Sequence, residues 1–106
     1  MEPGNLYRQI PDTLDEEIFE LLAQGENVEI KRIISNGHTS PGTGWYDQSQ
    51  YEWVLVLKGS ASISFENGKV IDLNEGDYLN ILPHQKHKVI RTSTATETIW
   101  LAIHYR

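Results

Sequence analysis

The fold is decided by residues 51–65, Tyr-Glu-Trp-Val-Leu-Val-Leu-Lys-Gly-Ser-Ala-Ser-Ile-Ser-Phe. Aromatic, β-branched and leucine side chains fill this stretch, which is typical of β-strands, and Lys58-Gly59 marks a single bend in it. Glu52 stands at the head of the first apolar run. A carboxylate is costly to bury without a partner. We therefore expect Glu52 to face a solvated cavity, a cation or a hydrogen-bonding partner, which makes it the first candidate site residue.

Short apolar runs of the same kind continue on both sides of this stretch. From Val28 onward they are separated by Gly, Asn and Pro, a pattern that indicates an all-β sandwich or barrel. The Asn67-Gly68 pair suits a type I′ turn and predicts a hairpin. Another turn is expected at residues 74–77, Asn-Glu-Gly-Asp. Strands are predicted near residues 28–35, 50–58, 60–66, 69–73, 78–82, 86–92 and 98–105.

The N-terminal part carries a helical pattern instead. Thr13 and Glu16 have the spacing of a capping box, and Gly25 supplies a stop. Apolar side chains recur at helical spacing between them, at Leu14, Ile18, Leu21 and Leu22. We therefore expect one domain over residues 1–106, with a lead-in and a short α-helix in residues 1–26 and a β-barrel in residues 27–106.

Composition excludes several classes of partner and site. The formal net charge is -6, from 9 Lys and Arg against 15 Asp and Glu, which is the wrong sign for binding nucleic acid through its phosphates. No apolar run approaches the roughly 20 residues of a membrane span. Residues 1–10 lack the pattern of a secretory signal, so a cytoplasmic location is expected. The absence of Cys leaves His, carboxylate, amide and phenol groups as the available metal ligands.

Two spaced motifs resemble the cupin family. Glu52 and Gly59, with six residues between them, look like the end of the first cupin motif. Gly76-Asp77, followed by His87 eleven residues after Gly76, looks like the second. The resemblance covers roughly residues 42–92, and the Gly-Trp-Tyr-Asp-Gln run before Glu52 is similar to small bacterial cupins of unassigned activity. It implies a jelly-roll β-barrel of the RmlC-like kind, often dimeric, with a pocket inside the barrel.

In metal-binding cupins the first motif supplies two histidines and a glutamate, and the second supplies another histidine. Here Glu52 and His87 match, and Tyr46 and Gln48, or else Trp45 and Asp47, stand where the paired histidines would be. Residues two apart on a strand share a face, which favours Tyr46 and Gln48 because they have the parity of Glu52. The resemblance thus implies a weak site for a divalent ion such as zinc, iron or manganese, formed by Tyr46, Gln48, Glu52 and His87. Trp45, Asp47 and His84 are candidate ligand-binding residues beside it.

Structural explanations compete with these assignments. His87 can equally be a hydrogen-bonded histidine at the barrel mouth, and Glu52 can pair with Lys58, Lys86 or Arg91. Tyr46, Trp53 and Trp100 are expected to pack in the core or rim. The remaining His38 and His104 are expected to be solvated, His104 because it lies near the chain end.

Three functions stay open at this point. The first is a metal-dependent enzyme, such as an oxygenase or isomerase, and the second is a metal-free pocket that binds or senses a small polar ligand. The third is a structural, dimeric module without catalysis. The sequence ranks metal or small-ligand binding first, expects a homodimer, and leaves open whether there is catalysis.

Overall fold

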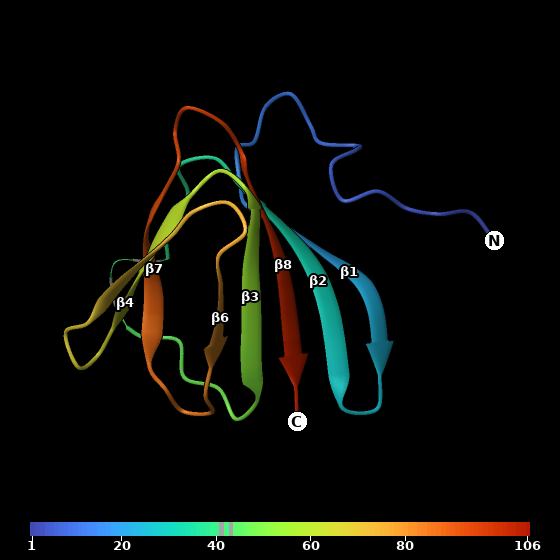
Figure 1. Ribbon diagram of the computed structural model, residues 1–106. Helices are drawn as coiled ribbons and strands as arrows, with labels where there is room; N and C mark the ends of the chain where they lie inside the picture. The colour runs from blue at the N-terminus through green and yellow to red at the C-terminus, as the bar shows by residue number, and fades with distance from the viewer. Residues whose placement is uncertain (41, 43) are drawn as a thin grey trace.

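The computed structural model describes residues 1–40, 42 and 44–106, so that Pro41 and Thr43 lie outside the described residues. The described chain forms two facing β-sheets (Figure 1). The larger sheet has the strand order β1-β2-β8-β3-β6, with β1 Ile18–Gly25, β2 Val28–Ser35, β8 Thr98–Tyr105, β3 Tyr51–Lys58 and β6 Tyr78–Ile81. The smaller sheet has the order β5-β4-β7, with β5 Val70–Leu73, β4 Ala61–Phe65 and β7 His87–Thr92. The prediction of an all-β jelly-roll fold is confirmed.

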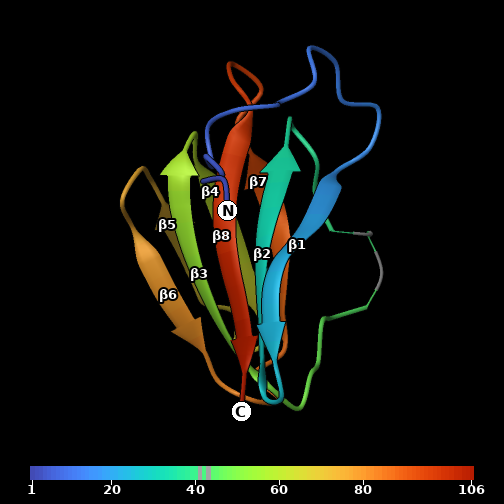
Figure 2. The ribbon, with the colours of Figure 1, turned by 90° about the vertical axis from the view of Figure 1, so that its right-hand side faces the viewer.

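The stretch at residues 51–65 joins the two sheets. Its first half is β3, between β8 and β6 in the larger sheet, and its second half is β4, at the centre of the smaller one. The chain turns between them at Gly59, whose φ of 86° lies in the left-handed region that favours glycine. Figure 2 shows the smaller sheet behind the larger one. The bend expected at Lys58-Gly59 is therefore the crossing from one sheet to the other.

The core lies between the sheets. Alternate side chains of β3 and β8 point between the sheets, and of these Val54, Val56, Trp100 and Ala102 are buried in one cluster. Ile63 and Phe65 of β4, Leu73 of β5 and Ile81 of β6 complete this cluster. Trp100 is 3% exposed, as expected of a core aromatic.

The predicted hairpin and the predicted turn after it are both present. β4 and β5 pair antiparallel across the Asn67-Gly68 turn, where Gly68 has a φ of 91°. At the next turn the backbone N of Asp77 donates to the carbonyl of Asn74 at 2.9 Å. Each strand predicted after residue 27 is found, with its bounds shifted by a residue at most.

The N-terminal helix prediction is wrong. Residues 18–25 form β1, which pairs antiparallel with β2 at the edge of the larger sheet. The side chains expected on a buried helical face do not gain burial, since Leu21 is 51% and Leu22 45% exposed. Pairing with the open edge of β2 supplies backbone hydrogen bonds that outweigh the local helical pattern. The two residues Glu26-Asn27 then turn the chain directly from β1 into β2.

The lead-in before β1 is attached through backbone contacts. Arg32 of β2 donates from Nη1 to the carbonyls of Leu6, at 3.1 Å, and Arg8, at 2.6 Å. Its Nη2 pairs with Glu20 at 2.5 Å.

In the described part of the chain, no helix is long and apolar enough to cross a membrane.

Candidate functional site

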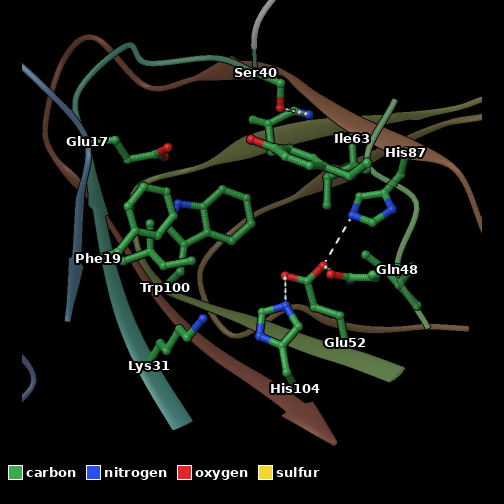
Figure 3. A pocket seen from close by; sticks show the side chains of 14 residues that line it. Glu17, Phe19, Lys31, Ser40, Gln48, Glu52, Ile63, His87, Trp100 and His104 are labelled. Carbon is green, nitrogen blue, oxygen red and sulfur yellow. Dashed lines mark hydrogen bonds and ion pairs between the residues drawn. The ribbon is translucent and has the colours of Figure 1, made fainter. Parts of the chain in front are cut away.

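A cavity of about 320 Å³ lies between the two sheets (Figure 3). Its walls are largely apolar and include Phe19, Ile33, Ile63, Val89 and Trp100. The polar lining residues are Glu17, Lys31, Ser40, Tyr46, Gln48, Glu52, His87 and His104. A concave, mainly apolar space with a few convergent polar groups is the usual form of a small-molecule site.

Glu52 is the centre of the polar end of this cavity. It is the second residue of β3, and the sheet register places it opposite His104 of β8 and Ile81 of β6. Its side chain is 14% exposed. His87 Nε2 lies 3.2 Å from its Oε1, and His104 Nε2 lies 3.4 Å from its Oε2 (Figure 3). The cavity therefore contains a carboxylate between two imidazoles.

His87 is held in one orientation by the chain around it. It begins β7, is 5% exposed, and donates from Nδ1 to the carbonyl of Gln85 at 2.9 Å. Because a carbonyl only accepts, Nδ1 carries a proton, and Nε2 is the atom left to face Glu52. Donation from Nε2 to the carboxylate as well requires the doubly protonated, positively charged ring.

The pKa directions agree with this geometry. Burial alone raises the pKa of Glu52, but hydrogen bonds from His104 and His87, together with their positive charge, outweigh it and hold the pKa well below its usual 4.5. Burial alone lowers the pKa of His87, but its hydrogen bonds to Glu52 and to the Gln85 carbonyl outweigh it and raise the pKa above its usual 6.5. Near neutral pH, Glu52 is thus ionised, and His87 holds its second proton more firmly than a free imidazole does.

Gln48 and Tyr46 reach the cavity from the segment before β3. The Gln48 amide donates from Nε2 to Oε1 of Glu52 at 2.8 Å. The backbone of Tyr46 pairs with that of His87, and its ring lies 5.9 Å from the imidazole, with half of the residue exposed. The four residues Tyr46, Gln48, Glu52 and His87 all line the cavity.

The other three candidate residues do not line the cavity. His84 Nδ1 lies 2.7 Å from Asp47 Oδ1, and the backbone N of His84 donates to the carbonyl of Gln48 at 2.7 Å. Trp45 lies under the ammonium of Lys88, at 4.4 Å from the ring centroid. Asp47 and His84 therefore tie the segment that carries Gln48 to the turn before His87.

Sequence reasoning missed four polar residues of the cavity, which are His104, Lys31, Glu17 and Ser40. His104, expected to be solvated, is 14% exposed and contacts Glu52. Its parity on β8 matches that of the buried Trp100 and Ala102, a signal that was available in the sequence. Lys31 and Glu17 also line the cavity, and nothing in the local pattern distinguished them from ordinary surface charges.

The side chains around Glu52 are of the types that bind a divalent ion, but they are not arranged around a common point as metal ligands are. Glu52, His87 and His104 supply one carboxylate and two imidazoles, a set found at zinc and non-haem iron sites. The hydrogen bond from His87 Nδ1 to a backbone carbonyl is also how proteins commonly orient a metal-binding histidine. Yet each imidazole points Nε2 at a carboxylate oxygen, and no three His, Asp or Glu side chains of the described residues are arranged as a metal site.

Comparison with solved structures shows what the chain is similar to. One is named "putative mannose-6-phosphate isomerase" from Ralstonia eutropha JMP134, with 40% identity, a TM-score of 0.94, and coverage of 99% of this chain and 98% of that one. A cupin superfamily protein from Desulfitobacterium hafniense is 23% identical, with a TM-score of 0.74 and coverage of 91% and 83%. An RmlC-like cupin from Desulfovibrio desulfuricans is 20% identical, with a TM-score of 0.75 and coverage of 98% and 96%. The last two show the shared fold alone.

No curated protein sequence matches the chain. The family model described as a cupin domain matches residues 33–104, which include Glu52, His87 and His104. This match spans most of the chain and agrees with the two motifs around Glu52 and His87. The protein therefore belongs to the cupin family.

Proposed function

We propose that the protein binds a small organic molecule in the cavity between its sheets, with Glu52, His87 and His104 at the polar end. The observation that carries this proposal is the buried carboxylate between two imidazoles at one end of an otherwise largely apolar cavity. Burying such a group is costly, and a core filled with apolar side chains would avoid the cost. A site for a ligand that needs this polar end accounts for its presence.

The protonation states favour proton transfer as the reaction class, if the site is catalytic. Glu52 is a weak base because its pKa is lowered, so it serves as a fixed negative charge that accepts hydrogen bonds. His87 is the group with a proton to give to a ligand oxygen, because its pKa is raised. Isomerisation of a hydroxy-carbonyl compound would use His87 as the acid that protonates the carbonyl oxygen, and the neutral imidazole that remains would be the base that takes the proton from the neighbouring carbon. The name of the Ralstonia protein, at 40% identity, supports testing mannose 6-phosphate first.

The ligand proposal is tested by thermal shift and NMR with chelator present. Mannose 6-phosphate should raise the melting temperature of the wild-type protein. At a ligand concentration of 100 times Kd, binding adds about 2.7 kcal/mol to the free energy of unfolding. The variant Glu52→Gln should lose this response, and Glu75→Gln, which changes an exposed glutamate, should keep it. NMR of the same samples would report any conversion to the ketose phosphate. An identical response in Glu52→Gln would contradict the proposed site.

A divalent ion is the second candidate occupant, favoured by the donor types at Glu52, His87 and His104. Such an ion, when bound, would supply a Lewis acid for a ligand oxygen. The chain's own part would be to hold the ion with these three side chains, with Gln48 as a neighbouring polar group. The set Tyr46, Gln48, Glu52 and His87 expected from sequence remains a prediction, and His104 is the ligand that we add to it.

Metal binding is tested on protein purified without a His tag. Titration with Zn²⁺ or Mn²⁺ should give stoichiometric binding with proton release, because the ion must displace the proton on Nε2 of His87. His104→Gln should weaken binding by at least about tenfold, a loss near 1.4 kcal/mol. His38→Gln, which changes a histidine outside the cavity lining, is the matched control. Equal affinity in the wild type and His104→Gln would remove His104 from the site.

A further inference from the structure

Lys31 is a cation inside the cavity that the proposed function does not yet use. It lies on β2, where the register pairs it with Ala102 of β8, and Ala102 is fully buried beside Val54. The side chain of Lys31 lines the same cavity as Glu52 and His104. In Figure 3 it extends from β2 toward the space between Trp100 and His104.

Lys31 also lacks a partner within the described part of the chain. None of the ion pairs or side-chain hydrogen bonds there includes it, although the chain carries 15 acidic residues. The two carboxylates of the cavity are engaged elsewhere. Glu17 accepts a hydrogen bond from the Ser35 hydroxyl, and Glu52 accepts from Gln48 and His87. By contrast, Lys58 and Lys86 pair with Glu97 and Glu66.

An unpaired ammonium of this kind suits an anionic ligand group. A lysine that only covers apolar surface directs its charged end into bulk water. Lys31 instead is half-buried and stands among the residues that line the cavity. A ligand oxyanion would give it the partner that the protein does not, in surroundings where a charge-assisted hydrogen bond is stronger than at an exposed surface.

We propose that the ligand carries an oxyanion, a carboxylate or phosphate, which Lys31 binds while an uncharged polar group lies toward Glu52, His87 and His104. This inference rests on the proposed small-molecule site and adds the charge and orientation of its ligand. The charge of Glu52 is already engaged with His87 and His104, so that end of the cavity offers hydrogen-bonding groups, whereas Lys31 offers an unpaired cation at the other end. The walls of Phe19 and Trp100 then contact the apolar part between them.

The test compares probes that share a shape and differ in charge. Benzoate and phenyl phosphate are anions, and benzamide is a neutral molecule of nearly the same shape as benzoate. Each is titrated by NMR into the protein with chelator present, and the indole signal of Trp100 and the methyl signals of Ile63 and Val89 report entry into the cavity. Benzoate should bind about tenfold more tightly than benzamide, the size of one charge-assisted contact.

The variants assign this preference to one residue. Lys31→Gln should bind benzoate no better than benzamide, whereas Lys31→Arg should keep the preference for benzoate. Lys69→Gln is the control and should behave as the wild type, because Lys69 is exposed on the β4–β5 hairpin. Unchanged binding of benzamide shows that Lys31→Gln is folded. Equal binding of benzoate and benzamide to the wild type would overturn the anion inference while leaving the small-molecule site intact. Entry of none of the three probes would count against both.

Discussion

Replacing Glu52 by Gln should destabilise the ligand-free protein by an amount that depends on pH. The wild-type carboxylate receives His87 on Oε1 and His104 on Oε2. The amide that replaces it offers one oxygen and one NH₂ group, so at least one imidazole loses its acceptor and faces another donor. The loss of one buried hydrogen bond to a charged group costs about 1.5–3 kcal/mol. For a domain of this size, each kcal/mol lowers the melting temperature by about 4–8 °C.

The pH dependence follows from the two pKa directions. The lowered pKa of Glu52 contributes stability that is present above 4.5 and is lost as the pH falls through the folded-state value. The raised pKa of His87 contributes stability that is fully present below 6.5 and is lost as the pH rises through its folded-state value. The difference in unfolding free energy between wild type and Glu52→Gln should therefore be largest between pH 4.5 and 6.5 and shrink on the alkaline side.

The assay is urea denaturation with chelator at about pH 5.5, 7 and 8.5, analysed as two-state unfolding. Glu75→Gln is the matched control, because it removes one negative charge from an exposed residue in a turn. Subtracting the Glu52→Gln profile from the wild-type profile isolates the site from other titrating groups. A difference that stays constant from about pH 5.5 to 8.5, or is absent, would refute the assigned ion pairs.

Two further outcomes test the fold and the assembly. In urea denaturation, Gly59→Ala should lower the free energy of unfolding by about 1–3 kcal/mol more than Gly68→Ala does. Both glycines have positive φ, but a Cβ at Gly59 would lie 2.5 Å from Oγ1 of Thr98, whereas Gly68 has open space around it. Equal losses of stability in the two variants would contradict this packing. We also propose that the outer face of the larger sheet, where Trp53 stacks on Tyr78, joins two copies of the chain. Trp53→Glu should then convert the dimer to a monomer in sedimentation experiments. A wild-type protein that is monomeric at micromolar concentration would contradict this proposal.

The strands were predictable because their ends carry strong local signals. The turns at Gly59, Gly68 and Gly76 need positive φ, and glycine adopts it without steric cost, so the sequence marks these positions. The error fell on residues 18–25, where the apolar residues fit helical spacing but the strand is decided by a distant partner. β1 exists because β2 offers it an open edge, and no window of local sequence contains that fact.

The site divides in the same way between local and distant information. Glu52 and His87 were found because two cupin-like motifs carry them, and the fold brings the two side chains to 3.2 Å. His104 carries no motif, and only its parity on β8 with Trp100 indicates that it faces inward. Lys31 is inward by the same rule on β2, opposite Ala102. Once strand registers are known, alternation alone selects both residues.

The arrangement around Glu52 also explains why cation and proton should compete there. The carboxylate is kept ionised by its contacts with His87 and His104, and Nε2 of His87 is both the atom that donates to it and the only atom of that ring free to bind an ion. A divalent ion can bind only as this proton leaves, so rising pH should favour the ion while it removes the stability that His87 gives the empty site. Opposite pH trends in the two measurements on one protein would thus trace both effects to the same imidazole.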